Sequence, residues 1–116
     1  MLLVDDEPEV LAAAAALLTI GGHEVTPAAG GAEALALASA SEFDVAVCDL
    51  VMPGMDGEQV LLELRELRPG LPVLVLTGRA EEQLERRLCA AGAAALLHKP
   101  VSRAELLQAV QRAVRH

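Results

Sequence analysis

Five polar residues have the types needed for metal-assisted phosphoryl chemistry. Three are acids, one is a hydroxyl and one is an amine: Asp5, Asp6, Asp49, Thr77 and Lys99. A buried carboxylate is costly unless something pairs with it, and carboxylates that lie close together raise one another's pKa. A divalent cation would remove that conflict. If the fold brings the three acids together, the sequence therefore predicts a metal site.

The cation that best suits this set is Mg²⁺, which prefers oxygen and typically takes one or two carboxylates together with substrate phosphate. Phosphoryl transfer needs an in-line nucleophile and positive charge around the phosphoryl oxygens. A carboxylate can be that nucleophile and form an aspartyl phosphate. We therefore predict that Asp49 is the nucleophile and that Asp5 and Asp6 hold the metal. Thr77 and Lys99 would contact the phosphoryl oxygens.

Each of these residues also has an ordinary structural explanation. Asp6 and Glu9 could form a helix capping box, and Asp49 could cap a loop. The hydroxyl of Thr77 could simply be hydrogen-bonded to a neighbouring group, and Lys99 could be a solvated surface charge. These explanations treat the residues singly, and they do not account for three acids, a hydroxyl and an amine at the ends of four of the five expected strands.

Short apolar runs that alternate with longer helical patterns must position these residues. The expected strands are 1–4, 23–27, 44–48, 72–76 and 94–97, and the expected helices are 8–20, 30–40, 57–67, 80–91 and 102–115. Helix stop and start signals agree with these bounds: Gly21-Gly22, Pro69-Gly70, Gly92 and Ser102. The alternation predicts one α/β domain with a doubly wound parallel sheet. Ligands of such sheets bind beyond the carboxyl ends of the strands, which is where the five residues fall.

The composition argues against several classes of function. The 116-residue chain has a net charge of −8 and a single aromatic residue, Phe43. Acidic chains repel phosphate backbones and anionic lipid, so nucleic acid and membrane surfaces are poor partners. No apolar run reaches the roughly 18–20 residues of a membrane span, and no signal peptide is recognisable. Cys48 and Cys89 lack metal or disulfide spacing, so we expect two small buried side chains in a reducing, cytoplasmic compartment.

On these residues the chain resembles the CheY-like receiver (response regulator) family of bacterial two-component signalling, over its whole length. The motifs that carry the resemblance are Asp5-Asp6-Glu7-Pro8, 49-DLVMPGMDG-57, Thr77-Gly78 and Lys99-Pro100. The resemblance implies a flavodoxin-like (βα)5 fold with strand order 2-1-3-4-5. It also implies a single receiver domain over residues 1–116, which acts as a phosphoacceptor and not as an enzyme with an external substrate.

The family pattern assigns a role to each site residue. Asp6 would bind Mg²⁺ directly, Asp5 largely through water, and the backbone carbonyl of Val51 would be a further ligand. Lys99 would pair with the phosphoryl group on Asp49, and Thr77 would move towards it on phosphorylation. The implied partner is a histidine kinase or a histidine phosphotransfer domain that carries phosphohistidine, and a homodimer is an option that the sequence allows.

The chain departs from the family pattern at two positions. Leu96 and Val101 stand where receivers commonly carry aromatic residues, so the usual output through the fourth helix and fifth strand is not predicted. His98, between them, is expected at the surface or at a strand edge. The run 67-LRPGLPVLVLTGR-79 resembles receivers attached to hybrid histidine kinases. The chain would then be part of a hybrid sensor kinase or a stand-alone receiver.

Other readings of the motifs fit less well. A dehalogenase-type phosphatase also uses an aspartate nucleophile, but it needs a second acid two residues later, where this chain has Val51. A flavodoxin-like cofactor carrier would need a first loop that cradles phosphate, whereas this loop is acidic. A receiver that only binds partners should have lost some of the site residues.

The first helix has too few charges for an ordinary surface helix. A buried stripe is expected at positions 10, 14, 17, 18 and 21, which leaves a face with no charge after Glu9: Leu11, Ala12, Ala13, Ala15, Ala16 and Ile20. Either alanine fills neutral positions because it is the best helix former, or this face docks against the helical bundle that carries the donor histidine.

Overall fold

The computed structural model describes residues 1–50, 57–78 and 81–114, and its centre is a parallel sheet of five strands. The strands are β1 (Leu2–Val4), β2 (Thr26–Ala28), β3 (Ala46–Asp49), β4 (Val73–Thr77) and β5 (Ala95–His98). Their spatial order is β2-β1-β3-β4-β5, and every neighbouring pair is parallel. The predicted doubly wound fold and strand order are therefore confirmed.

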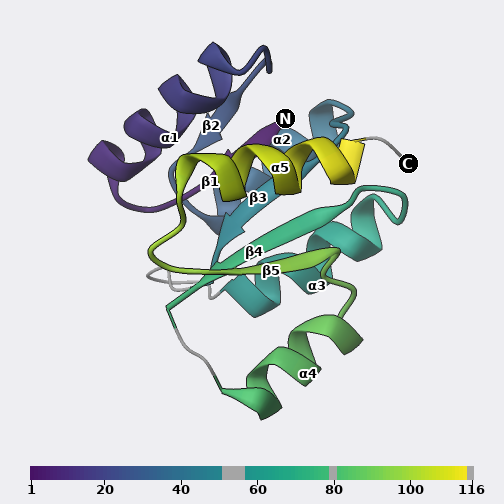
Figure 1. Ribbon diagram of the computed structural model, residues 1–116. Coiled ribbons are helices and arrows are strands. Elements are labelled where there is room, and N and C mark those ends of the chain that lie inside the picture. The colour runs from purple at the N-terminus through teal and green to yellow at the C-terminus, as the bar shows by residue number, and fades with distance from the viewer. Residues whose placement is uncertain (51–56, 79–80, 115–116) are drawn as a thin grey trace.

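Five helices, one after each strand, cover both faces of the sheet. They are α1 (Pro8–Ile20), α2 (Gly31–Ala40), α3 (Gly57–Leu67), α4 (Glu82–Ala90) and α5 (Arg103–Val114). Residues of α1 and α5 pack on one face, and residues of α2, α3 and α4 pack on the other (Figure 1). Strand β5 and helix α4 lie at one edge of the molecule, and β2 at the opposite edge.

The central strands have no polar alternation because both of their faces are covered. Val47 and Leu74 point into the core beneath α1 and α5, whereas Cys48 and Val75 point into the core beneath α2, α3 and α4. All four are at most 1% exposed. The two cores hold the carboxyl ends of β3 and β4 at a fixed spacing, which is what a site at that edge requires.

The helix stop and start signals act as predicted. Gly22 and Gly92, just after α1 and α4, have φ values of 93° and 103°, a conformation that glycine adopts without strain. Ser102 precedes α5, and its Oγ accepts a hydrogen bond from the backbone N–H of Glu105 at 3.1 Å. Strand β2 begins later than predicted, at Thr26, because its pairing is limited to the three residues of β1.

The predicted stripe of α1 is partly confirmed. Ala14, Leu17 and Leu18 pack on the core as expected, but Leu11 and Ala15 also pack partly against it, although the sequence placed them on the free face. Val10, placed in the stripe, is 44% exposed, and Gly21 is also exposed. A helix that is apolar all round has no polar face to fix its rotation, so the packing of its larger side chains decides it.

The prediction that both cysteines are buried holds for one of them. Cys48 is fully buried in β3, whereas Cys89 is exposed on α4. Leu84 and Leu88 fill the buried side of α4, and Cys89 follows Leu88 by one residue, which turns it outward by about 100°.

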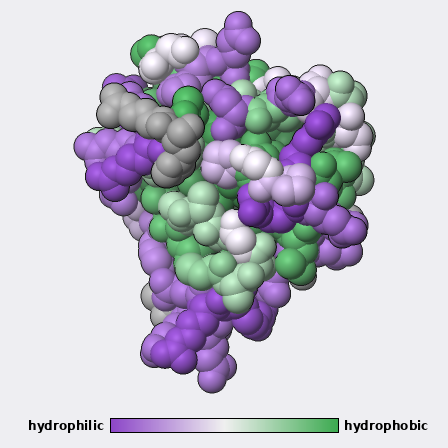
Figure 2. All heavy atoms as spheres, turned by 90° about the vertical axis from the view of Figure 1, so that its right-hand side faces the viewer, coloured by the Kyte–Doolittle hydropathy of each residue, from purple (hydrophilic) through white to green (hydrophobic). Residues whose placement is uncertain are grey.

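Hydrophobic side chains occupy the middle of the face shown in Figure 2, and the lowest part of the molecule, where α4 lies, is mostly hydrophilic. Within the described residues, no helix has the length and apolar character needed to cross a membrane.

The start of α3 depends on a very close backbone approach at Gly57. Its N–H donates to the carbonyl of Leu50 at 2.6 Å. A Cβ added at Gly57 would lie 2.4 Å from Leu50 Cα and 2.6 Å from the carbonyl oxygen of Asp49. Both are backbone atoms, so neither can move aside without shifting the end of β3.

Replacing Gly57 with alanine should therefore lower the free energy of unfolding by about 1–3 kcal/mol, the usual cost of overpacking. Gly70→Ala is the matched control, because a Cβ there meets no atom within 4 Å. Urea unfolding of both variants measures the difference. Equal stability of the two variants would show that α3 adjusts without cost.

Candidate functional site

The carboxyl ends of four strands bring all five predicted residues to one edge of the sheet. Asp5 follows β1, Asp49 ends β3, Thr77 ends β4 and Lys99 follows β5. Among the described residues, Asp5, Asp49 and Thr77 are the buried polar side chains, with exposures of 5%, 4% and 0%. Asp6 is half-buried beside Asp5. The convergence inferred from the strand ends is thus present in the structure.

The three acids form a compact cluster. One carboxylate oxygen from each of Asp5, Asp6 and Asp49 lies within 4.8 Å of the others. Oxygens bound to one Mg²⁺ at about 2.1 Å are at most about 4.2 Å apart, so small side-chain rotations would bring these three onto a single ion. An all-oxygen, negatively charged set is the kind of site that suits a hard divalent cation.

Lys99 supplies the positive charge beside this cluster. Its Nζ donates to Asp49 Oδ1 at 2.9 Å, and its side chain is 39% exposed whereas that of Asp49 is 5% exposed. The backbone N–H of Lys99 also donates to the carbonyl oxygen of Thr77 at 2.8 Å. The peptide bond between Lys99 and Pro100 is cis. Lys99 is therefore tied to the ends of both β3 and β4, and it is not an unpaired surface charge.

Burial raises the pKa of the Asp5 carboxyl above its ordinary value. The hydrogen bond from the backbone N–H of Glu7 to Asp5 Oδ1, at 2.9 Å, lowers that pKa. The negative charges of Asp49 and Asp6 raise it, and the positive charge of Lys99 lowers it. The net shift is upward, so Asp5 prefers its neutral form more than an exposed aspartate does.

The capping box considered for Asp6 and Glu9 is absent. Helix α1 begins after Glu7, its N-cap makes no side-chain hydrogen bond, and Pro8 occupies the first turn as predicted. Asp6 therefore does not serve as the helix cap and stays within the acid cluster.

Two neighbours of the site were not identified from the sequence. Gly57 lies against the backbone of Asp49, and the only sequence signal for it was its place in the glycine-containing loop after the strand. Cys48 donates its thiol to the Asp49 carbonyl oxygen at 3.4 Å, and burial, with the charges of Asp49 and Asp5, raises the pKa of the thiol to about 12. It is therefore an inert thiol. The predicted backbone ligand Val51 lies outside the described residues.

The sequence matches the family model described as "Response regulator receiver domain" over residues 1–111. It is 35% identical over 114 residues to the transcriptional regulatory protein GlrR of Escherichia coli, an alignment that covers 98% of this chain and 26% of that protein. The chain thus spans about a quarter of the length of this curated relative.

Two solved structures are similar along nearly their whole length. Chemotaxis protein CheY4 of Vibrio cholerae gives a TM-score of 0.91 at 34% identity, covering 97% of this chain and 95% of that one. The second is the receiver domain of a Pseudomonas aeruginosa sensor histidine kinase, which was solved with a magnesium ion coordinated in the active site cleft. It gives a TM-score of 0.89 at 31% identity, and the match covers 99% of this chain and 96% of that one.

The raised pKa of Asp5 predicts a pH-dependent effect of Asp5→Asn. Between the unfolded and the folded pKa the native state holds more protons, so the carboxylate of Asp5 costs stability as the pH rises. In the presence of EDTA the variant should be more stable than the wild type at pH 7, and the difference should shrink as the pH falls below about 4. Urea unfolding at both pH values is the measurement. A wild type as stable as the variant at pH 7 would contradict it.

Proposed function

Because the chain belongs to the response regulator receiver family, in which the domain is a phosphoacceptor of two-component signalling, we propose that Asp49 is its phosphorylation site. The donor would be a phosphohistidine on a histidine kinase or on a histidine phosphotransfer domain. The observation that carries the proposal is the 2.9 Å contact of Lys99 with a buried Asp49, beside two further acids whose oxygens lie within 4.8 Å.

The proposed step is an in-line displacement at phosphorus. A carboxylate oxygen of Asp49 attacks the phosphoryl group, a new oxygen–phosphorus bond forms, and the phosphorus–nitrogen bond of the donor breaks. The leaving histidine nitrogen keeps the electron pair, and because the donor ring carries a proton on its other nitrogen, it leaves as neutral imidazole. Lys99, already on Asp49 Oδ1, holds the carboxylate in a fixed rotation and then meets the charge of the phosphoryl oxygens.

Asp5, Asp6 and Asp49 would hold Mg²⁺, with the backbone carbonyl of Val51 as the further ligand predicted from the sequence. When bound, the ion supplies positive charge at the phosphoryl oxygens. Supporting observations are the all-oxygen cluster and the magnesium described for the similar kinase receiver. A bound cation would offset the neighbouring negative charges that help to raise the pKa of Asp5. Thr77 would move towards the phosphoryl group and bias the molecule between two states.

Residues 1–116 would form one receiver domain, alone or within a longer cytoplasmic protein such as a sensor kinase. It would catalyse its own phosphorylation and would not turn over an external substrate. No observation favours the phosphatase alternative, which lacks its second acid at Val51.

Acetyl phosphate with Mg²⁺ should add one phosphoryl group to the wild type and none to Asp49→Asn, because the amide is not a nucleophile. Intact-mass measurement reads the modification, and the same reaction with EDTA is the control for metal dependence. Modification that persists in the variant, or an unmodified wild type, would contradict the assignment of Asp49.

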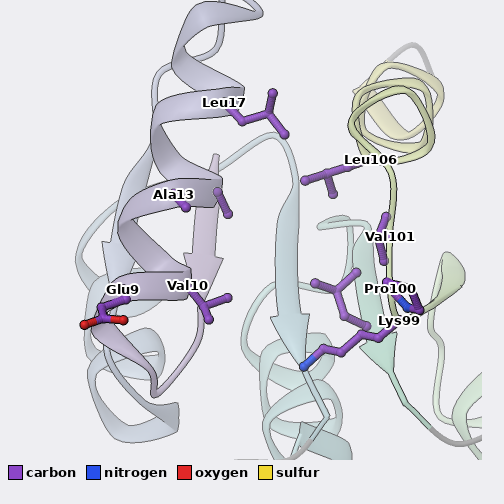
Figure 3. Close-up of a pocket in the computed structure, with 10 residues that line it drawn as sticks. Glu9, Val10, Ala13, Leu17, Lys99, Pro100, Val101 and Leu106 are labelled. Carbon is purple, nitrogen blue, oxygen red and sulfur yellow. The ribbon is translucent and has the colours of Figure 1, made fainter.

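The donor would dock on a groove between α1 and the loop that leads into α5. The groove has a volume of about 770 Å³, and Lys99 is among the residues that line it. Figure 3 shows Val10 and Leu17 of α1 facing Val101 and Leu106 across it. Ala13 adds little bulk between them, so a partner helix could approach closely. The groove adjoins Asp49 through Lys99, which suits a partner that must deliver a phosphoryl group there.

Glutamates at Ala13 and Ala16, both exposed, should reduce phosphorylation by a protein donor at least several-fold, because each charge must be desolvated on docking. Phosphorylation by acetyl phosphate should be unchanged. Glutamates at Ala36 and Ala40, exposed on α2, form the matched control. Equal transfer from the protein donor to all variants would show that α1 is not the docking face.

A further inference from the structure

We infer that the groove between α1 and the loop before α5 binds the tail of a small-molecule phosphoryl donor, namely an acyl phosphate whose apolar chain has several carbons. The inference rests on the proposed phosphorylation of Asp49 and names a second class of donor for it. The phosphoryl group of this donor would lie at the acid cluster. Its chain would lie along the groove, in the place that the helix of a protein donor would otherwise take.

The groove begins at the site and runs away from it along α1. Lys99 marks the near end, because its Nζ donates to Asp49 Oδ1 at 2.9 Å while its side chain lines the groove. Figure 3 shows Val10 at the level of Lys99, and Leu17 facing Leu106 at the far end. The stretch of helix from Val10 to Leu17 is about 10 Å long. The groove therefore has the length for a chain of several methylenes.

The walls of the groove suit a ligand that is charged at one end and apolar along the rest. Among the described residues that line it, Glu9 and Lys99 are the charged ones, and both lie at the near end (Figure 3). Beyond them the lining is apolar, and Val10 is 44% exposed. The volume of about 770 Å³ falls within the roughly 300–1,000 Å³ of small-molecule sites.

The chemistry at the near end identifies the charged group as a phosphoryl group on an acyl oxygen. Its oxygens would meet Lys99, and a carboxylate oxygen of Asp49 would attack the phosphorus. A new oxygen–phosphorus bond forms, and the bond between phosphorus and the acyl oxygen breaks. The acyl group leaves as a carboxylate that keeps the electron pair, so no proton has to be supplied.

The experiment compares acetyl, butyryl and hexanoyl phosphate as donors in the presence of Mg²⁺, each below saturation, with intact mass as the measure of phosphorylation. The three leaving carboxylates have nearly equal basicity, so a difference in rate reports on the chain. A fully buried methylene contributes up to about four-fold, and a groove open on one side should give about two-fold. Hexanoyl phosphate should therefore react about ten- to twenty-fold faster than acetyl phosphate.

Val10→Asn should reduce this ratio of rates at least three-fold, because an amide would then face the chain. Leu62→Asn on α3 is the matched control, since Leu62 is 49% exposed and lies outside the lining of the groove. Taking the ratio within each variant cancels any effect on the transfer step. Binding alone is measured with hexylphosphonate, which cannot transfer its phosphorus. It should inhibit the reaction with acetyl phosphate more strongly than methylphosphonate does.

Equal rates for the three donors in the wild type would overturn the inference and leave the groove to a protein helix or to a second copy of the chain. Equal inhibition by the two phosphonates would overturn it as well. So would a ratio that is unchanged in Val10→Asn or that falls equally in Leu62→Asn. If acetyl phosphate itself does not modify the wild type, the proposed function fails too. If all three donors modify Asp49 at one rate, only the role of the groove fails.

Discussion

The ion pair between Lys99 and Asp49 is the interaction on which the rest of the site depends. Asp49 is a buried carboxylate with Asp5 and Asp6 beside it, so without a cation it would carry the cost of burial and of repulsion together. Lys99 meets that charge at 2.9 Å. The pair is possible because parallel strands bring the ends of β3 and β5 to one edge, and because two packed cores keep the strands in register. Lys99 neutralises one of the three negative charges, and the charges of Asp5 and Asp6 still repel one another and Asp49. A divalent cation bound at this edge of the sheet would offset that repulsion.

The same lysine links the surfaces that surround the site. Its side chain lines the groove against α1, its backbone holds Thr77, and the residue before it contacts α4. Asp49 is therefore connected to the groove through Lys99, and to α4 through Lys99 and the adjacent His98. Gly57 adds a second constraint. It lies very close to the backbone of Asp49 and Leu50, so it fixes the end of β3. Asp49 is thus held by the backbone at Gly57 on one side and by Lys99 on the other.

The sequence predicted most of the fold, and it predicted which polar residues gather at the carboxyl ends of the strands. Alternating runs and glycine stop signals predicted the parallel sheet, and the polar residues at the ends of four of the five runs predicted the cluster of acids near Lys99. Predictions from the sequence were wrong where a helix is apolar on all sides, and they were missing where two elements distant in sequence make contact. The apolar α1 fixed its rotation only roughly: Leu17 and Leu18 were placed correctly, but Leu11 and Val10 were assigned to the wrong sides. Cys89 was placed inside because cysteine is usually buried, although Leu88 takes the inward position on α4. The contact of His98 with Glu85 joins two separate elements, and no local pattern could predict it.

Thermal unfolding during a Mg²⁺ titration tests the central claim most directly, namely that this edge of the sheet is held ready for a divalent cation. A ligand that binds the folded chain and not the unfolded one raises the unfolding midpoint in a saturable way. We predict such a rise for the wild type, and its loss when Asp5 and Asp6 are both replaced by alanine. A midpoint that does not respond to Mg²⁺, or an equal rise in the double alanine variant, would contradict the account.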